Sequence, residues 1–279
     1  MCGLLPMAVS VYSYTIYHSP NAYLGTVLLR RALSDLPGVA LVRRPIYVPR
    51  ERGLMIADLL VVGTKQMIPS APLTSRLLRR SAPRNDGCLR CHCERSEAIS
   101  AMGRRVPDVR FAPLGGKENK NTGSYNREDC RRWSERFAIP MSYPDPDVFH
   151  ERAQRWAASP FDREELPARA FYAADPGNRD CLDQLLFEAA WVEGLDVNEP
   201  ATIGWAAERA GLDPKHLMAA LNEPGPAAKM RSALEEFERL QCPGVPTVIV
   251  DGRRFFGKDR VDWVADFCRA QAAVHQTVA

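Results

Sequence analysis

The densest group of chemically active side chains lies at residues 88–100, CLRCHCERSEAIS, which hold three of the eight cysteines. Cys88, Cys91 and His92 follow the C-x-x-C-H pattern of c-type haem attachment, and Cys93 adds a further possible zinc ligand. Because Cys91, His92 and Cys93 are adjacent in the chain, they are awkward ligands for one tetrahedral ion. Haem attachment also requires an exported, oxidising context. A metal-binding or haem-binding protein is therefore a minor alternative.

The stretch YHSPNAY at residues 17–23 is a second candidate site, because a strand-like run there gives way to helical spacing. At the start of that helix, Ser19 can donate a hydrogen bond to a thiolate brought by a ligand, and the exposed backbone N–H groups add to the stabilisation. The simpler interpretation makes Ser19 the N-cap and Pro20 the first helical residue, with no ligand. His18 has the chemistry of a base, but a histidine at a strand end is more often structural. The local sequence leaves both interpretations of Ser19 open.

The motif GVPT at residues 244–247 opens a strand near the C-terminal end of the chain. A cis bond between Val245 and Pro246 would turn the backbone of Val245 outward, ready to pair with an extended ligand. The ordinary alternative is a trans proline at the first position of a strand. The motif alone does not decide between them.

The motif FFGKDR at residues 255–260 precedes the last helical pattern. Asp259, with Asp262 three residues further on, is explained by itself as a helix N-cap. A helix start that also offers a carboxylate suits a zwitterionic amino-acid group, because backbone N–H groups bind its carboxylate while Asp259 binds its ammonium. A γ-glutamyl group has that shape.

Composition places the chain among ordinary globular proteins, with 46% hydrophobic and 25% charged residues. No signal peptide and no apolar run of about 20 residues is evident, so we expect a cytoplasmic protein with mostly free thiols and no membrane contact. The net charge of +3 is local: residues 76–110 hold nine Arg against four acidic residues, which leaves about −2 for the remainder. Nucleic acid is therefore not an expected partner.

The order of strand and helix patterns predicts an α/β protein. A strand at residues 9–17, a helix after Ser19 and a second strand near residues 37–48 form a βαβ unit. After residue 225 come a helix, a strand, a tight Asp-Gly turn, a second strand and a closing helix. Between these parts the pattern is helical. The sequence predicts a thioredoxin-like fold with an inserted all-helical subdomain.

The predicted domain boundaries follow from this order. Residues 9–50 and 226–272 form a discontinuous thioredoxin-like domain, and residues 51–225 form the helical insertion. The Arg-rich segment at about 66–122 has little periodicity, and a loop of that length inside a compact domain is improbable unless it is functional or disordered. We expect it to be a disordered or loosely packed insertion.

The sequence as a whole resembles the 2-hydroxychromene-2-carboxylate isomerase and kappa-class glutathione transferase family, which has a DsbA-like thioredoxin fold. The resemblance covers residues 9 to about 62 and 125–270, roughly three quarters of the chain. Six motifs in register carry it: SPNAYL at 19–24, RRPI at 43–46, YNREDCRRW at 125–133, AAWVEGLDVNEP at 189–200, GVPT at 244–247 and FFGKDR at 255–260.

The resemblance implies a cytoplasmic, bacterial, glutathione-dependent enzyme, with a homodimer as the family expectation. Its small-molecule substrate would be an aromatic or conjugated electrophile, and its outcome isomerisation or transfer. Ser19 would stabilise the glutathione thiolate. Val245 and Pro246 would hold the cysteinyl backbone, and Lys258 with Asp259 the γ-glutamyl end. Arg44 and Pro45 are a weaker prediction for the substrate side.

Two further alternatives remain at this stage. A catalytically degenerate protein would bind glutathione without turnover. A DsbA-type thiol–disulfide oxidoreductase would need the C-x-x-C pair that Ser19, Pro20, Asn21 and Ala22 replace. Because the Cys-rich stretch lies in the segment that the resemblance leaves out, deletion of residues 76–110 is predicted to leave glutathione binding intact.

Overall fold

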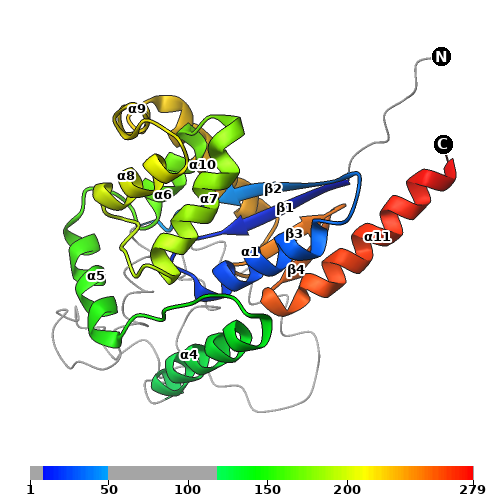
Figure 1. Ribbon diagram of the computed structural model, residues 1–279, viewed down its shortest axis with the longest axis horizontal. Helices are drawn as coiled ribbons and strands as arrows, with labels where there is room; N and C mark the ends of the chain where they lie inside the picture. The colour runs from blue at the N-terminus through cyan, green and yellow to red at the C-terminus, as the bar shows by residue number, and fades with distance from the viewer. Residues whose placement is uncertain (1–8, 50–117, 279) are drawn as a thin grey trace, which may run out of the picture.

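The computed structural model describes residues 9–49 and 118–278 and shows a mixed α/β protein built on a four-stranded sheet (Figure 1). The strand order is β2-β1-β3-β4. Strand β1 (Val9–Thr15) pairs in parallel with β2 (Val39–Pro45) and antiparallel with β3 (Thr247–Val250). The predicted α/β fold is thus confirmed, and the two ends of the chain meet in one sheet.

The first three elements form the predicted βαβ unit. Helix α1 (Pro20–Leu33) connects β1 to β2, and its apolar residues pack into the core while Arg30 and Arg31 occupy its last turn. Cations at a helix C-terminus interact favourably with the helix dipole. Thr15 lies opposite Pro45 in the register, so both parallel strands end at the same edge of the sheet. The start of α1 therefore lies at that edge.

The C-terminal hairpin also follows the sequence. Strand β4 (Arg253–Phe256) pairs with β3, and the turn between them has positive φ at Asp251 (48°) and Gly252 (71°), as the Asp-Gly dipeptide predicts. A short 3₁₀ turn, η2 (Lys258–Arg260), leads into helix α11 (Val261–Val278). The expected N-cap role of Asp259 is wrong: no side-chain cap is formed at this turn, where Gly257 takes the cap position.

Helices fill the chain between β2 and β3 wherever the structure describes it. Figure 1 shows α5–α9 gathered at the side toward which β1 and β2 point, with α1 and α11 against the sheet. The bounds are α4 (Glu118–Phe137), α5 (Pro146–Ala158), α6 (Glu165–Ala173), α7 (Pro176–Trp191), α8 (Pro200–Arg209), α9 (Pro214–Ala220) and α10 (Pro224–Arg239). None of the helices in residues 9–49 and 118–278 has the length and apolarity needed to cross a membrane.

One detail of the helical segment differs from the sequence prediction. Helix α4 begins at Glu118, inside the stretch at about 66–122 that was expected to lack structure. The remainder of that stretch lies outside the described residues. So do Cys88, Cys91, His92 and Cys93, and the predicted effect of deleting residues 76–110 therefore stays a prediction.

Apolar side chains pack on both faces of the sheet. One core joins α1, α7 and α11 to the face that carries Val11 and Val250. The second joins α6 and α10 to the opposite face, which carries Tyr14 and Ile249. This arrangement follows from strand geometry, because successive residues of a strand point to opposite faces.

A buried ion pair connects the sheet to the helical segment. The Arg43 guanidinium on β2 lies 2.9 Å from the Asp183 carboxylate on α7, and their side chains are 1% and 0% exposed. Arg30 lies 3.0 Å from the same carboxylate, and the Tyr17 hydroxyl donates to it at 2.9 Å. Burial alone would raise the pKa of Asp183, but Arg43 and Arg30 hold it below its ordinary value. The carboxylate is thus a charged centre fixed by three partners.

We predict that Asp183→Asn lowers the free energy of unfolding by about 3–5 kcal/mol, because it leaves the Arg43 charge buried without its counterion. Asp180→Asn is the matched control: Asp180 lies on the same helix, 3.7 Å from Arg30, but its side chain is 70% exposed. Urea unfolding should place the control within about 1 kcal/mol of wild type. Equal losses in the two variants would contradict the role given to Asp183.

Candidate functional site

Ser19 occupies the junction where β1 gives way to α1. Its backbone is extended (φ −93°, ψ 115°), and its Oγ accepts a hydrogen bond from the Ala22 N–H at 3.2 Å. Pro20 follows as the first helical residue. The N-cap interpretation is therefore confirmed. It does not compete with the thiolate interpretation, because the cap uses Ser19 as an acceptor and leaves its hydroxyl proton as a donor.

The GVPT loop lies against α1, the helix that this serine caps. The Val245–Pro246 bond is cis, as the resemblance implied. Gly25 makes the contact possible, since a Cβ at that position would stand 3.0 Å from Pro246 Cγ and 3.5 Å from Lys258 Cα. A glycine on this face of α1 thus brings both C-terminal motifs close to the start of the helix.

Lys258 points inward and is engaged by two neighbouring segments. Its ammonium lies 2.6 Å from the Asp129 carboxylate of α4 and donates to Asn21 Oδ1 at 2.7 Å. It also lies 5.1 Å from the centre of the Trp133 ring. The Lys258 side chain is 10% exposed, and the Asp129 carboxylate balances its charge.

Asp259 points the other way, although it is the next residue. Its carboxylate lies 2.6 Å from Arg260 and its side chain is 52% exposed. The backbone of Gly257 makes room for it: Gly257 has φ 101°, and a Cβ there would stand 2.5 Å from Asp259 Oδ1. The glycine of FFGKDR is thus required both for its backbone conformation and for the position of Asp259.

The weaker prediction, Arg44 and Pro45, concerns the end of β2. Arg44 lies 3.8 Å from Glu236 of α10 and over the Tyr12 ring, so it faces the α10 side of the sheet. Pro45 is buried, and its carbonyl accepts a hydrogen bond from Tyr172 at 3.0 Å. The structure brings Pro246 and Lys258 together against Gly25 of α1, the helix that Ser19 caps, and places Arg44 on the opposite face from Arg43.

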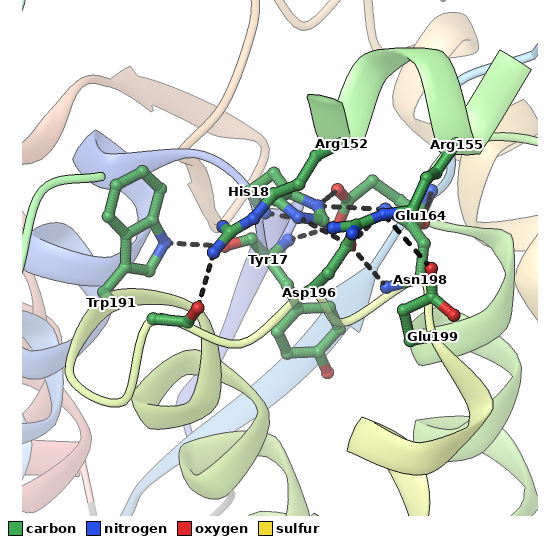
Figure 2. A network of polar contacts seen from close by, with 10 residues as sticks. Tyr17, His18, Arg152, Arg155, Glu164, Trp191, Asp196, Asn198 and Glu199 are labelled. Carbon is green, nitrogen blue, oxygen red and sulfur yellow. Dashed lines mark hydrogen bonds and ion pairs between the residues drawn. The ribbon is translucent and has the colours of Figure 1, made fainter. Parts of the chain in front are cut away.

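A buried polar network, not predicted from the sequence, lies immediately before Ser19. We call its four members, His18, Glu164, Asp196 and Asn198, the His18 network (Figure 2). The His18 ring pairs through Nδ1 with the Glu164 carboxylate, lies 3.4 Å from Asp196 through Nε2, and lies 3.4 Å from the Asn198 amide. The Glu164 and Asp196 carboxylates both belong to the helical segment, which therefore binds the residue that follows the end of β1.

Glu164 is held in an uncommon conformation for this contact. Its φ is 67°, which is costly for a residue other than glycine, and its side chain is fully buried. Its Oε2 accepts hydrogen bonds from the backbone N–H of Tyr17 at 2.7 Å and of His18 at 3.3 Å. Its own N–H donates to Asn198 at 3.0 Å. These bonds offset the cost of the backbone conformation.

The charges in the network favour a protonated histidine. Burial alone would lower the pKa of His18, but Glu164 and Asp196 outweigh it and raise the pKa to about 9. Conversely, burial would raise the pKa of each carboxyl, while His18 holds both below their ordinary values. Arg155 lies 3.6 Å from Asp196 at the edge of the network. His18 is thus a buried cation at neutral pH, which makes it a poor general base.

Among the described residues, no cysteine is placed for thiol chemistry at this site. The nearby Cys130 thiol is buried 3.7 Å from Asn21 Oδ1, and burial raises its pKa to about 11. All four described cysteines are free, as expected, and Cys181 is the exposed one among them. The described residues hold no cluster of His, Cys, Asp and Glu that fits a metal ion. Within residues 9–49 and 118–278, no thiol is thus available as the reacting sulfur at this site.

Comparison with known sequences now decides the family. Residues 107–269, more than half of the chain, match the DsbA-like thioredoxin domain. The chain belongs to the DsbA-like thioredoxin family. The matched range begins after β1, α1 and β2. In the structure, β1 and β2 nevertheless belong to the same four-stranded sheet as β3 and β4, which lie inside the matched range.

Two relatives of this DsbA-like protein share one description. A 2-hydroxychromene-2-carboxylate isomerase from Sphingobium xenophagum is 22% identical over 173 residues, which cover 57% of this chain and 82% of the relative. A solved structure of 2-hydroxychromene-2-carboxylate isomerase superimposes with a TM-score of 0.57 at 16% identity, covering 97% of this chain and 99% of that chain. A probable DsbA oxidoreductase from Streptomyces coelicolor gives a TM-score of 0.52 at 14% identity, covering 95% and 89%. At these identities the structures show the fold.

Sequence reasoning missed the partners that hold the site. Nothing local marks Glu164, Asp196 or Asp129 as neighbours of the α1 N-terminus, since they lie more than 100 residues away. Asn21 offered a weak signal, because it is the second helical residue after Ser19.

We predict that the ion pairs of His18 stabilise the fold below about pH 6.5, the ordinary histidine pKa, and that this stabilisation is lost as the pH rises through about 9. The sign follows because a raised pKa means that the folded state binds the proton more tightly than the unfolded chain. The full effect is at most about 3 kcal/mol. Urea unfolding of wild type and His18→Gln at pH 6 and above pH 9 measures it.

The difference in unfolding free energy between wild type and His18→Gln should be larger at pH 6. Substitution of the exposed His216 on α9 by Gln is the control for loss of a histidine outside the network. An equal difference at the two pH values would contradict a buried imidazolium.

Proposed function

We propose that this protein is a glutathione-dependent isomerase or transferase, similar to 2-hydroxychromene-2-carboxylate isomerase, in which Ser19 stabilises the glutathione thiolate. The observation that carries the proposal is the position of Ser19. It is a half-buried hydroxyl at the start of a 14-residue helix, where DsbA-type oxidoreductases would carry the first cysteine of a C-x-x-C pair. The fold keeps the anion-stabilising end of α1 and replaces the thiol by a donor.

The geometry around Ser19 suits a thiolate. Its Oγ is already oriented by the hydrogen bond from Ala22, so the hydroxyl can donate outward with little loss of entropy. The helix start adds backbone N–H groups and the positive end of the dipole, both of which lower the pKa of a bound thiol. His18, one residue away, belongs to the network that fixes this junction, and Glu164 and Asp196 balance its charge there.

The remaining parts of glutathione have candidate partners in the two C-terminal motifs. Val245, beside Pro246, is half-exposed and lies in the loop that packs on Gly25, so its backbone can pair with the cysteinyl unit. Asp259 would release its ion pair with Arg260 and bind the γ-glutamyl ammonium in its place. That exchange costs little, because exposed ion pairs contribute at most about 1 kcal/mol. Lys258, which pairs with Asp129, would also form an ion pair with the γ-glutamyl carboxylate.

Glutathione, when bound, supplies a thiolate that adds to an electrophilic carbon and in an isomerase leaves again. The protein then has two tasks. Ser19 and the α1 N-terminus keep the thiol deprotonated, and the helical segment positions a conjugated or aromatic substrate over it. We place the isomerase outcome first, because two relatives carry that name. A cytoplasmic location and a homodimer belong to the same proposal.

We predict that Ser19→Ala raises the pKa of the thiol of bound glutathione by about one unit or more, since it removes a hydrogen bond to a charged group. The readout is the ultraviolet absorbance of the thiolate during a pH titration of the complex. Ser34→Ala is the matched control, because Ser34 lies at the other end of α1 and its hydroxyl bonds to the Arg31 carbonyl. Absence of glutathione binding to wild type, or an unchanged thiol pKa in Ser19→Ala, would refute the proposal.

A DsbA-type oxidoreductase is the second candidate, supported by the family itself. Wild type lacks a thiol pair at the start of α1, so we predict no reduction of insulin disulfides by wild type and measurable reduction by the double substitution Ser19→Cys and Ala22→Cys. The pair would stand at the N-cap and third helical position of α1. Disulfide reduction by wild type that disappears on mutation of any cysteine would favour this candidate over ours.

A further inference from the structure

A turn at residues 16–19 connects the end of β1 to the start of α1. The Ser19 N–H donates to the Ile16 carbonyl at 3.3 Å and closes the turn, which has Tyr17 and His18 as its central residues. Ser19 is at once the last residue of this turn and the N-cap of α1. The direction of the Ser19 hydroxyl therefore depends on the conformation of the turn.

One carboxylate oxygen binds both central N–H groups of the turn. Glu164 Oε2 accepts from the Tyr17 N–H at 2.7 Å and from the His18 N–H at 3.3 Å, while Oε1 pairs with the His18 ring (Figure 2). Two successive backbone N–H groups that share one acceptor form a small anion site. Because Tyr17, His18 and Glu164 are all buried, a change in the turn would leave a polar atom without a partner.

The backbone of Glu164 takes a costly conformation to make this contact. Its φ of 67° lies in the left-handed region, and it is held there by its N–H, which donates to Asn198 at 3.0 Å, and by its carbonyl, which accepts from the Ala168 N–H at 3.1 Å. A residue that the surrounding structure keeps in a sparsely populated conformation is often a functional one. Here that conformation places the Glu164 carboxylate on the turn before Ser19.

The charge of Glu164 does not explain a benefit at Ser19. A carboxylate near a bound thiol would by itself raise the pKa of that thiol, which opposes thiolate formation. The ion pair with His18 also balances the Glu164 charge inside the protein. The favourable contribution of Glu164 to the site is thus its effect on the position of the backbone.

We propose that Glu164 is a positioning residue for the thiolate-stabilising hydroxyl: it fixes the turn at residues 16–19, and the turn fixes the direction of the Ser19 O–H. The inference rests on the function proposed for Ser19 and adds to it a residue from the helical segment. Glu164 acts through the backbone of Tyr17 and His18 and needs no contact with glutathione.

The test measures the pKa of the thiol of bound glutathione by ultraviolet absorbance in two variants that separate reach from charge. Glu164→Asp keeps the charge and tolerates a positive φ, but its carboxylate is one methylene shorter and cannot hold both N–H groups. It should raise the thiol pKa by about half a unit or more, and by no more than Ser19→Ala does, because a hydrogen bond weakens steeply when its donor is misdirected.

Glu164→Gln is the complementary variant. It keeps an oxygen within reach of both N–H groups and removes the charge, so the thiol pKa should not rise. The midpoint of urea unfolding should fall, because the ion pair with His18 is lost.

Two controls distinguish positioning from general damage to the fold. In the Ser19→Ala background, Glu164→Asp should add no further rise in the thiol pKa, because no hydroxyl is left to position. Leu217→Ala creates a cavity under α9, where Leu217 is buried, so it should lower the urea midpoint and leave the thiol pKa at the wild-type value.

The inference is overturned if Ser19→Ala raises the thiol pKa and Glu164→Asp does not. It is also overturned if Glu164→Asp raises the thiol pKa equally with and without the Ser19 hydroxyl, or if Glu164→Gln raises it as much as Glu164→Asp does. An unchanged thiol pKa in Ser19→Ala itself would instead refute the function proposed for Ser19.

Discussion

The junction between β1 and α1 depends on how the helical segment holds Tyr17. The backbone N–H of Tyr17 donates to Glu164, its carbonyl accepts from the Trp191 indole at 2.7 Å, and its hydroxyl donates to Asp183. All of these groups are buried, so loss of any one leaves a polar atom without a partner. Two residues further along stands Ser19. The position of the proposed catalytic hydroxyl is therefore set by side chains that lie more than 140 residues away in the sequence.

Because these bonds hold Tyr17, the inserted helices help to position the start of α1 as well as covering it. They supply both carboxylates of the His18 network and the Asp183 that neutralises Arg43. The C-terminal motifs approach from the other side, where Gly25 admits Pro246 against α1. The start of α1 is thus enclosed by parts of the chain that fold onto it from both directions. Such an arrangement provides the preorganisation that the proposed thiolate stabilisation requires.

Much of the fold could be predicted from sequence, because the strands, the Asp-Gly turn and the long helices depend on local pattern. Ser19 and Pro246 have local signatures too, a helix start and a proline before a strand, but the roles proposed for them came from the family resemblance. Glu164 had none: it lies in a left-handed turn, and only the folded chain brings it to His18. The Asp259 cap failed because a 3₁₀ turn intervenes before α11. Partners chosen by tertiary packing leave no periodic signal.

The most direct measurement is a crystal structure of the protein bound to glutathione. The account predicts that the sulfur lies within hydrogen-bonding distance of Ser19 Oγ, with the cysteinyl backbone paired to Val245 and the tripeptide on the Pro246 side of α1. A sulfur placed elsewhere, or bonded to Cys130, would contradict the claim that a serine at the helix start has replaced the redox cysteine.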